Sequence, residues 1–401
     1  MHVLIIAQYF PPDLGGAATR AYNAAKGLIM NGCKVTVVTT FPHYPNGEIP
    51  LEYRWYPIRL EWIDGIRVIR TFIFPLQSKG LARRIILFCT FISSSLFAFP
   101  LIEKIDVIWA TNPDIVSMIP AIIYHILKKK AIFSNVDDLI LQDLYDLNLI
   151  VEHSLISKVA ELFTRLLYSK AKAITPVSPG YIGYISQRYF VGTKKIHVVR
   201  GGVDPTIFAP ISIKKNCKRF LVIYSGSFSI AYDFDQVIKA AQIMEKKGLF
   251  DFILQGKGEL IDHVKFKIKN LKLKNVCVLE KVLSRKEVAE LLNKADALIL
   301  PLREFGKPYR GLSSKIYEYQ ASGKPIICCA RGQPAIHVEK TNSGFVVIPG
   351  DFKKIADMIL FLNENPEIAR DMGRHGKKYV ETNVSIKAIG YKLKKIFSNF
   401  G

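Results

Sequence analysis

Acidic residues are scarce in this sequence. Its 401 residues include 34 aspartates and glutamates against 56 lysines and arginines, which gives a formal net charge of +22. Such an excess favours an anionic partner, namely nucleic acid, an anionic membrane face or a phosphorylated ligand, and charge alone does not choose among them. A hydrophobic fraction of 49% is that of a globular protein and argues against disorder. At this length, two domains are expected.

Patterns that bind metals or form disulfides are also lacking. The six cysteines include no C-x-x-C pair, and the eight histidines show no metal-ligand spacing, so we expect reduced thiols and no metal cofactor. G-x-S-x-G, H-E-x-x-H and P-loop motifs do not occur. Met1–Ala7 resembles a strand and lacks a basic leader and a cleavage site, so we expect no signal peptide and a cytoplasmic location.

Long hydrophobic runs are rare, and the main exception is Ile85–Ile102. These eighteen residues carry no charge, follow Arg83 and Arg84, and lie at the lower limit for a membrane-spanning helix. A spanning helix would put the flanking strands on opposite sides of a membrane, where they could not share a sheet. The segment is therefore a buried core helix or a helix at a membrane interface. The basic flanks, and Lys128–Lys130 after a second apolar stretch, favour the anionic inner face of a membrane.

Short apolar runs alternate with helical patterns in both halves of the chain. This alternation predicts βαβ units and an α/β fold with parallel sheets. The predicted strands are Val3–Ala7, Val35–Thr40, Val107–Ala110, Ala131–Ser134 and Ala173–Val177 in the first half, and Phe220–Ser225, Phe252–Gln255, Val276–Leu279, Ala297–Leu300, Pro325–Cys329 and Gly344–Ile348 in the second.

The boundary between the halves is predicted after Gly201–Pro205 and before the basic run Lys214–Arg219. We expect one Rossmann-like domain over residues 1–205 and another over residues 206–383, with their parallel sheets facing a central cleft. A C-terminal helix over residues 384–399 is expected to pack back on the first domain.

Gly15 and Gly16 lie between the first predicted strand and a helix. Paired glycines at such a turn let the backbone approach phosphate oxygens, and the helix N-terminus favours an anion. The ordinary alternative is a tight turn that needs small residues. A dinucleotide fingerprint is not expected, because the spacing is not G-x-G-x-x-G and no acid follows the second strand.

The second candidate site is the helix start at Ser313, Ser314 and Lys315. Its hydroxyls, amides and lysine suit a diphosphate, and Glu318 can accept hydrogen bonds from ribose hydroxyls. A capped helix with a solvated Glu318 is the equal alternative.

Two glycine turns in the same half of the chain support a phosphate-bearing ligand. Gly226 and Gly256-Lys257-Gly258 each follow a predicted strand, at the sheet edge where α/β proteins bind ligands. Lys257 and Lys315 would supply positive charge there.

Taken together, these segments resemble the family 4 glycosyltransferases of the GT-B fold, close to bacterial and archaeal members that build cell-surface glycans. The resemblance covers essentially the whole chain, and the opening segment is similar to a subgroup that transfers N-acetylated amino sugars. The matching segments are Ala7–Pro12 with Gly15-Gly16, Phe41–Pro45, Arg200–Asp204, Gly256–Glu259, Ala295–Ala297 and Ser314–Tyr319.

The resemblance implies a retaining glycosyltransferase that uses a UDP- or GDP-sugar bound mainly by the C-terminal domain. It implies transfer of a hexose or an N-acetylated amino sugar to a glycan or lipid-linked acceptor, without a metal. Glu318 matches the second glutamate of the family's Glu-x7-Glu motif, whereas Arg310 occupies the first position. Glu304 lies fourteen residues before Glu318, so we do not assign it to the motif.

The same resemblance implies the roles of individual residues. The loop after Gly226 lacks the family's phosphate-binding lysine, so Gly16 amides, Lys257 and Lys315 are expected to stabilise the leaving diphosphate. His43, Asp138 and Lys257 are the catalytic candidates, with the acceptor near the first two. The implied donor-binding set is Gly15, Gly16, Gly226, Lys257, Gly311, Leu312, Ser313, Ser314, Lys315 and Glu318.

Two other functions remain open from the sequence. A sugar-nucleotide epimerase uses the same architecture but needs no acceptor. A basic nucleic-acid-binding protein would also explain the charge, although no RNA-recognition, zinc-finger or basic-helix motif occurs, so we expect no nucleic-acid partner.

Overall fold

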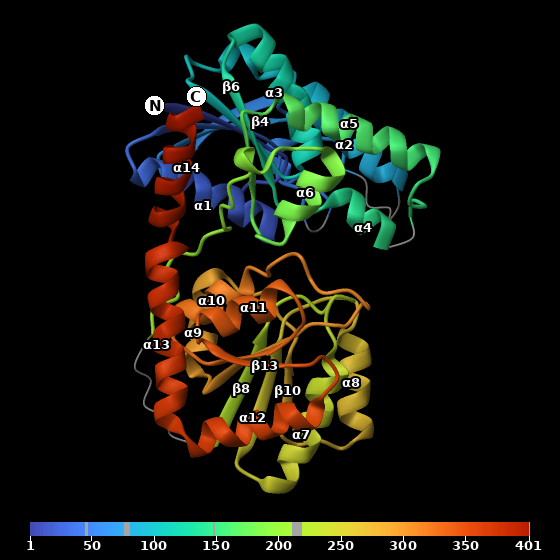
Figure 1. Cartoon of the computed structure of the whole chain (residues 1–401), viewed down its shortest axis with the longest axis vertical. Helices are drawn as coiled ribbons and strands as arrows, with labels where there is room; N and C mark the ends of the chain where they lie inside the picture. Colours follow the sequence, from blue (N-terminus) through green and yellow to red (C-terminus); the bar gives the residue numbers. More distant parts are fainter. Residues whose placement is uncertain (45–46, 76–80, 147–148, 211–218, 401) are drawn as a thin grey trace. The chain divides into compact units, whose positions relative to one another are not determined.

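The computed structural model describes residues 1–400 except 45–46, 76–80, 147–148 and 211–218 (Figure 1). It divides the chain into unit 1, which comprises Met1–Gly202 with Ile386–Gly401, and unit 2, which comprises Val203–Ser385. Three features of the sequence lie outside the described residues: Pro45 of the Phe41–Pro45 motif, the side chains of Arg83 and Arg84, and most of the basic run 214–219.

Unit 1 is built on a sheet with the strand order β3-β4-β2-β1-β5-β6-β7. β1 lies at its centre, and Ile5 of β1 pairs in parallel with Val37 on one side and Trp109 on the other. The predicted strands of this half are confirmed. The strands are β1 His2–Ala7, β2 Lys34–Thr40, β3 Ile58–Ile63, β4 Ile66–Thr71, β5 Val107–Thr111, β6 Ala131–Val136 and β7 Ala173–Pro176; the helices are α1 Gly16–Met30, α2 Leu81–Phe97, α3 Asp114–Lys128, α4 Ile140–Asp146, α5 Leu155–Lys170, α6 Tyr181–Tyr189 and α14 Ile386–Phe400.

The hairpin of β3 and β4 at one edge of this sheet was not predicted from the sequence. The two strands are antiparallel and are joined by Asp64 and Gly65, which both have positive φ. Asp-Gly between two segments in which apolar and polar residues alternate is a strong hairpin signal that would have revealed the pair. Arginine is unusual in a buried strand, so β4 does not read as one in the sequence. Arg70 is nevertheless fully buried, because it forms an ion pair with Glu61 of β3.

The apolar run Ile85–Ile102 is not one helix. α2 ends at Phe97, and a short 3₁₀ helix, Phe99–Leu101, follows it around Pro100. One face of α2 packs on β2 and β4, where Ser94 donates a hydrogen bond to Thr71 over 3.0 Å. In the part of the chain that the structure describes, no helix is long and apolar enough to cross a membrane.

Unit 2 is a parallel sheet with the order β10-β9-β8-β11-β12-β13. The order reverses between β8 and β11, and α/β sheets bind ligands at the carboxyl ends of strands at such a point. All predicted strands of this half are confirmed. The strands are β8 Phe220–Ser225, β9 Phe250–Gln255, β10 Val276–Leu279, β11 Ala297–Pro301, β12 Ile326–Cys329 and β13 Gly344–Val347; the helices are α7 Phe234–Lys247, α8 Ile261–Asn270, α9 Arg285–Lys294, α10 Lys315–Ala321, α11 Gln333–Lys340, α12 Phe352–Glu364 and α13 Pro366–Asn383.

The C-terminal helix α14 packs against α1 in unit 1, side by side in Figure 1. The two backbones are so close that a Cβ on Gly27 would lie 2.3 Å from the carbonyl oxygen of Ile386 and 3.0 Å from the Cα of Gly390. Further along, the ring of Phe397 packs 4.7 Å from that of Phe133. Glycine at the crossing therefore lets the end of the chain complete the core of unit 1.

We predict that Gly27→Ala lowers the free energy of unfolding by about 2 kcal/mol, because the new methyl overpacks a backbone contact. Gly183→Ala is the matched control, since Gly183 lies in α6 of the same unit with nothing within 4 Å of its Cβ position. That change should stabilise the protein by about 0.5–1 kcal/mol through helix propensity. Denaturant unfolding followed by circular dichroism measures both; equal effects would contradict the close contact.

Candidate functional site

The loops that follow β8 and β9 in unit 2 are packed backbone to backbone. The amide of Gly226 donates to Gln255 and the amide of Phe228 donates to Lys257, both over 2.9 Å. A Cβ on Gly256 would lie 1.7 Å from the carbonyl oxygen of Gly226. Glycine at 256 is therefore required by the contact between the two loops, whatever ligand they bind.

Gly226 is required by its backbone conformation, with φ at +153°, and the side chain of Lys315 passes directly over it. A Cβ on Gly226 would lie 1.8 Å from the Cε of Lys315. The ammonium group donates to the Tyr232 hydroxyl over 2.9 Å and lies 4.9 Å from the centre of that ring. Lys315 thus brings a positive charge from α10 to the turn after β8, where the sequence offers no lysine of its own.

Glu318 lies one turn further along α10, and its side chain is 23% exposed. Its Oε1 is 3.5 Å from a guanidinium nitrogen of Arg285, at the start of α9. Burial raises the pKa of Glu318, and the positive charges of Arg285 and Lys315 oppose that rise. The hydroxyl of Tyr319 accepts a hydrogen bond from the Ser225 amide over 3.0 Å, which fixes α10 against the end of β8.

Gly311, Leu312, Ser313 and Ser314 form the segment that leads into α10. Leu312 packs on the core of unit 2, and the Ser314 side chain makes no capping hydrogen bond. The segment therefore continues directly into α10, the helix that carries Lys315 and Glu318.

The loop before this segment is fixed by Tyr309, whose amide donates to Arg331 over 3.2 Å and whose hydroxyl donates to Arg303 over 2.9 Å. Glu304 pairs with Arg331 at 3.3 Å, while the side chain of Arg310 is exposed. Glu318 and Glu304, which its spacing excluded from the motif, therefore have different arginine partners, Arg285 for Glu318 and Arg331 for Glu304.

Lys257 lies in the loop that packs against the Gly226 turn, where its carbonyl oxygen accepts a hydrogen bond from the Phe228 amide. The Lys257 side chain is exposed in the loop after β9. The pKa of Glu280 is lowered mainly by a hydrogen bond from Lys265, and the charge of Lys257 adds to this effect. The structure therefore places Lys315 at Gly226 and Lys257 beside the acid that follows β10.

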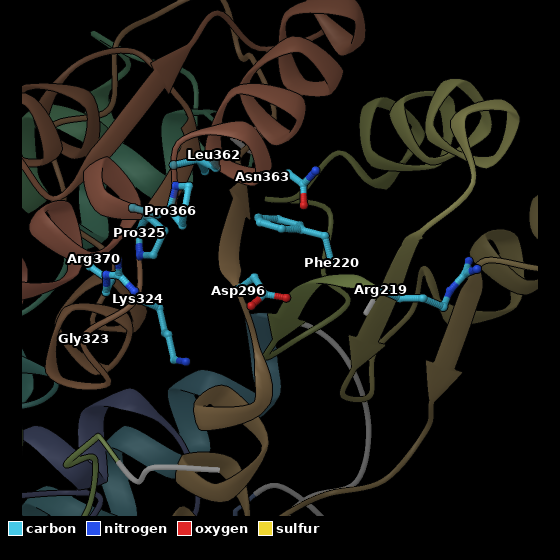
Figure 2. A pocket seen from close by; sticks show the side chains of 11 residues that line it. Arg219, Phe220, Asp296, Gly323, Lys324, Pro325, Leu362, Asn363, Pro366 and Arg370 are labelled. Atoms are coloured by element: carbon cyan, nitrogen blue, oxygen red, sulfur yellow. The ribbon is translucent and has the colours of Figure 1, made fainter. Parts of the chain in front are cut away.

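A separate cavity of about 370 Å³ opens at the opposite edge of the unit 2 sheet, by the amino ends of β8, β11 and β12 (Figure 2). Its charged groups already have partners within the unit. Arg219 pairs with Asp251 at 2.7 Å, and Asp296 accepts from the Leu221 amide over 2.8 Å. Its place at the amino ends makes it a weak candidate for ligand binding.

In unit 1, Asp13 joins the loop after β1 to the loop after β2. Its Oδ1 accepts hydrogen bonds from the amides of His43 and Tyr44, each over 2.8 Å. Gly15, at φ +112°, lies under the Tyr44 ring, and Gly16 begins α1. Burial raises the pKa of Asp13, and His43 opposes the rise. Asp13 was not among the predicted site residues, although an acid between the apolar residues Pro12 and Leu14 was a signal for it.

His43 is buried at the same place, with its ring 5.4 Å from that of Tyr9. Its Nδ1 lies 2.9 Å from the carbonyl oxygen of Phe41, which can only accept a hydrogen bond, so Nδ1 carries the ring proton. Nε2 is then free of hydrogen and can accept a hydrogen bond. Among the described residues, His43 Nε2, Asp13 Oδ2 and Gln8 Oε1 are buried without a hydrogen-bond partner. Buried polar atoms are normally paired, so this group is suited to a polar ligand or to water.

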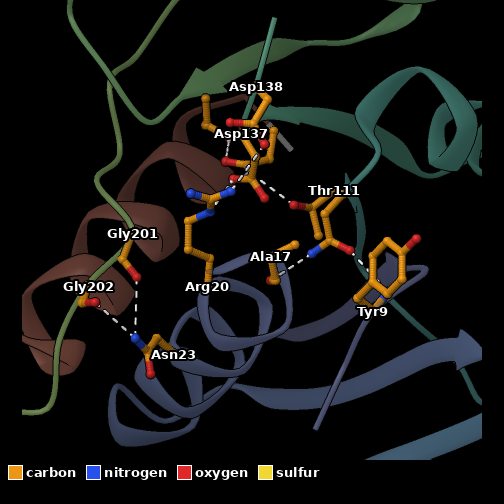
Figure 3. A network of polar contacts seen from close by, with 12 residues as sticks. Tyr9, Ala17, Arg20, Asn23, Thr111, Asp137, Asp138, Gly201 and Gly202 are labelled. Carbon is orange, nitrogen blue, oxygen red and sulfur yellow. Dashed lines mark hydrogen bonds and ion pairs between the residues drawn. The ribbon is translucent and has the colours of Figure 1, made fainter. Parts of the chain in front are cut away.

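Asp138 belongs to another network of unit 1, which is centred on Arg20 of α1 (Figure 3). Arg20 lies 3.1 Å from Asp137 and 3.5 Å from Asp138, whose side chains are 5% and 63% exposed. Asp137 also accepts from Asn135 over 2.7 Å. The buried Asp137 thus anchors Arg20, and the predicted residue Asp138 presents its carboxylate to solvent.

Glycines of the Arg200–Asp204 motif make room for this network. A Cβ on Gly201 would lie 2.8 Å from the side chain of Arg20, and the carbonyl oxygen of Gly202 accepts from Asn23 over 2.9 Å. The motif therefore positions α1, and with it Arg20, against the last segment of the first half of the chain.

We predict that Asp137→Ala lowers the free energy of unfolding by about 3–5 kcal/mol, because it leaves the largely buried Arg20 charge without its main partner. Asp138→Ala should cost less than about 1 kcal/mol, since its carboxylate is exposed. Denaturant unfolding of the two variants measures the difference. Losses of similar size would show that the two carboxylates share the anchoring of Arg20.

The chain was compared with known families and structures. Residues 14–207 match the model "Glycosyltransferase Family 4", and residues 208–379 match "Glycosyl transferases group 1". No curated protein gives a significant match. Among solved structures, a sucrose-phosphate synthase from Thermosynechococcus elongatus is 15% identical with a TM-score of 0.77, over 100% of this chain and 98% of that chain.

Two further structures have the same fold. Anabaena HepE in complex with UDP and glucose is 15% identical with a TM-score of 0.69 over 99% of both chains. WaaG, a glycosyltransferase involved in lipopolysaccharide biosynthesis, is 14% identical with a TM-score of 0.66, over 99% of this chain and 100% of that chain. The two family models between them span nearly the whole chain and both units, so the protein belongs to the family 4 glycosyltransferases of the GT-B fold and is a transferase.

Proposed function

We propose that the protein transfers a hexose or an N-acetylated amino sugar from a UDP- or GDP-sugar to a glycan or lipid-linked acceptor, with retention of anomeric configuration. The observation that carries the proposal is the grouping of Lys315 and Glu318 at the turn after β8. This turn lies where the strand order of unit 2 reverses, the expected position for a nucleotide. The HepE complex with UDP and glucose has the same fold, which is consistent with such a donor.

In this proposal Lys315 stabilises the negative charge that grows on the diphosphate as the glycosidic bond breaks. Its ammonium is held by Tyr232 and is therefore oriented before the ligand arrives. The hydroxyls of Ser313 and Ser314 and the amides of Gly311 and Leu312 would complete the contacts to phosphate and sugar. Lys257, in the neighbouring loop after β9, would supply a second positive charge for the leaving diphosphate.

Glu318 would accept hydrogen bonds from the two ribose hydroxyls. This role needs the anionic form, because an ionised carboxylate only accepts. Burial raises the pKa of Glu318, but the neighbouring cations Arg285 and Lys315 favour the charged form. Arg285 then serves to position the carboxylate.

Unit 1 would bind the acceptor, through the buried group around His43 and through Asp138. His43 Nε2 is an acceptor and can receive a hydrogen bond from a sugar hydroxyl. We assign no side chain as the general base, and we propose that the donor phosphate takes the proton of the acceptor hydroxyl. We further propose that the protein acts in the cytoplasm, at the inner face of the cell membrane, without a metal cofactor.

We predict that Glu318→Ala weakens the binding of UDP or GDP by at least about tenfold, the value of one or two charge-assisted hydrogen bonds. Lys315→Met should weaken the binding of UDP or GDP to a similar extent and leave the binding of uridine or guanosine unchanged. Titration calorimetry of each variant with nucleoside and with nucleoside diphosphate separates the two roles.

Glu304→Ala is the matched control, because Glu304 is also a partly exposed glutamate paired with an arginine, but in the Arg331 loop. It should bind nucleotides like the unchanged protein. If Glu304→Ala weakens binding and Glu318→Ala does not, the nucleotide site is assigned to the wrong glutamate.

The anomeric configuration of the product, determined by NMR, tests retention. Conversion of UDP-N-acetylglucosamine without an acceptor would indicate an epimerase.

A further inference from the structure

One helix of unit 1 exposes an apolar face. α5 packs against α3, α4 and α6 through its buried side, on which Ser157, Thr164 and Tyr168 lie. The residues of the opposite side follow the helical spacing i, i+4, i+7 and i+11. They are Leu155, Val159, Leu162 and Leu166, which are 79%, 60%, 56% and 55% exposed.

The apolar face extends to one side of this stripe. Ile156 and Phe163 are 68% and 43% exposed, and they border a depression of about 410 Å³ that is lined by apolar side chains of α5. A solvated helix face normally carries polar residues, so six large exposed apolar side chains on one helix need an explanation.

Positive charges border the same face. Lys158 and Arg165, seven residues apart, run along its other side, and Lys170 ends the helix. Glu161, the acid within the sequence of α5, is turned inward to Arg188, with which it pairs at 2.7 Å. Arg165 also lies 4.5 Å from the ring of the exposed Phe190, which adds an aromatic side chain to this cationic border.

We propose that the exposed face of α5 docks unit 1 on an anionic lipid membrane. The apolar stripe would enter the boundary between headgroups and acyl chains, and Lys158 and Arg165 would contact lipid phosphates. A second copy of the chain fits this face poorly, because a symmetric contact would bring the same cations together from both copies. The proposal refines the membrane location given under Proposed function, and it does not depend on the nucleotide site.

The α5 face differs from the segment that the sequence favoured for membrane contact. α2 exposes Ile85, Ile86 and Phe97, but Leu87 and Phe91 between them are buried in the core of unit 1. Among the side chains that the structure describes, from residue 85 onward in α2, fewer large apolar residues are exposed than in α5. α2 offers a matched control for the α5 face, since it also presents large apolar side chains to solvent.

The test is flotation of the full chain with vesicles of phosphatidylglycerol and phosphatidylcholine, and with vesicles of phosphatidylcholine alone. We expect binding to the anionic vesicles, and a loss of at least about tenfold in the partition coefficient for the triple variant Leu155→Ser, Val159→Ser, Leu162→Ser. The control variant Ile85→Ser, Ile86→Ser, Phe97→Ser should change it by less than about twofold.

The charge component has its own variant. Lys158→Gln with Arg165→Gln should reduce binding to anionic vesicles by about tenfold or more and weaken its dependence on salt. Stabilisation by UDP or GDP should be the same in all variants, which shows that they fold. If the unchanged protein binds vesicles but neither UDP nor GDP, the result contradicts the proposed function and leaves the docking intact.

Two results would overturn the docking. In the first, the α5 variant binds anionic vesicles as the unchanged protein does, or the α2 variant is the one that loses binding. In the second, analytical ultracentrifugation shows a dimer that the α5 variant dissociates, while no form of the protein binds vesicles. The second result would assign the face to self-association.

Discussion

Both units depend on backbone segments that approach each other more closely than a Cβ atom allows. In unit 1, Gly27 meets the carbonyl oxygen of Ile386, so α14 can lie directly against α1. In unit 2, Gly256 meets Gly226 and thereby joins the loops after β8 and β9. Gly226 also shapes the candidate site, since the side chain of Lys315 passes over it and a Cβ there would lie 1.8 Å from the Lys315 Cε. Glycine at positions 27 and 256 is therefore needed for backbone packing, and Lys315 lies against one of these packed loops.

Much of the fold follows from the sequence because its signals are local. Each predicted strand is confirmed within one or two residues, since a buried parallel strand is a continuous apolar run. β3 and β4 were missed because Arg70 interrupts the run, and its charge is offset by Glu61 on the neighbouring strand. A compensation of that kind is visible only once the strands are paired.

The candidate site was predicted less completely, because its contacts join residues that are far apart in the chain. Lys315 and Tyr232 are 83 residues apart, and Asp13 and His43 are 30 apart. The motif at α10 identified Lys315 and Glu318, but the reach of Lys315 over Gly226 depends on the sheet order. Likewise, the sequence offered Asp138 without its neighbour, although Asp137 is the carboxylate that holds Arg20 inside the unit. Local pattern identifies the residue types, whereas burial decides which of two neighbours is structural.

The group of polar residues at the ends of β1 and β2 contains buried atoms that lower the stability of the fold when they have no hydrogen-bond partner. Gln8 Oε1, Asp13 Oδ2 and His43 Nε2 lie buried without a partner in the described part of the chain. Each such atom costs about 1–3 kcal/mol if nothing binds it, and an apolar side chain would avoid that cost. The pKa of Asp13 is raised by the same burial. Buried polar atoms of this kind are normally paired with a ligand or with water, and we propose hydroxyl groups of the acceptor as the partners of this group.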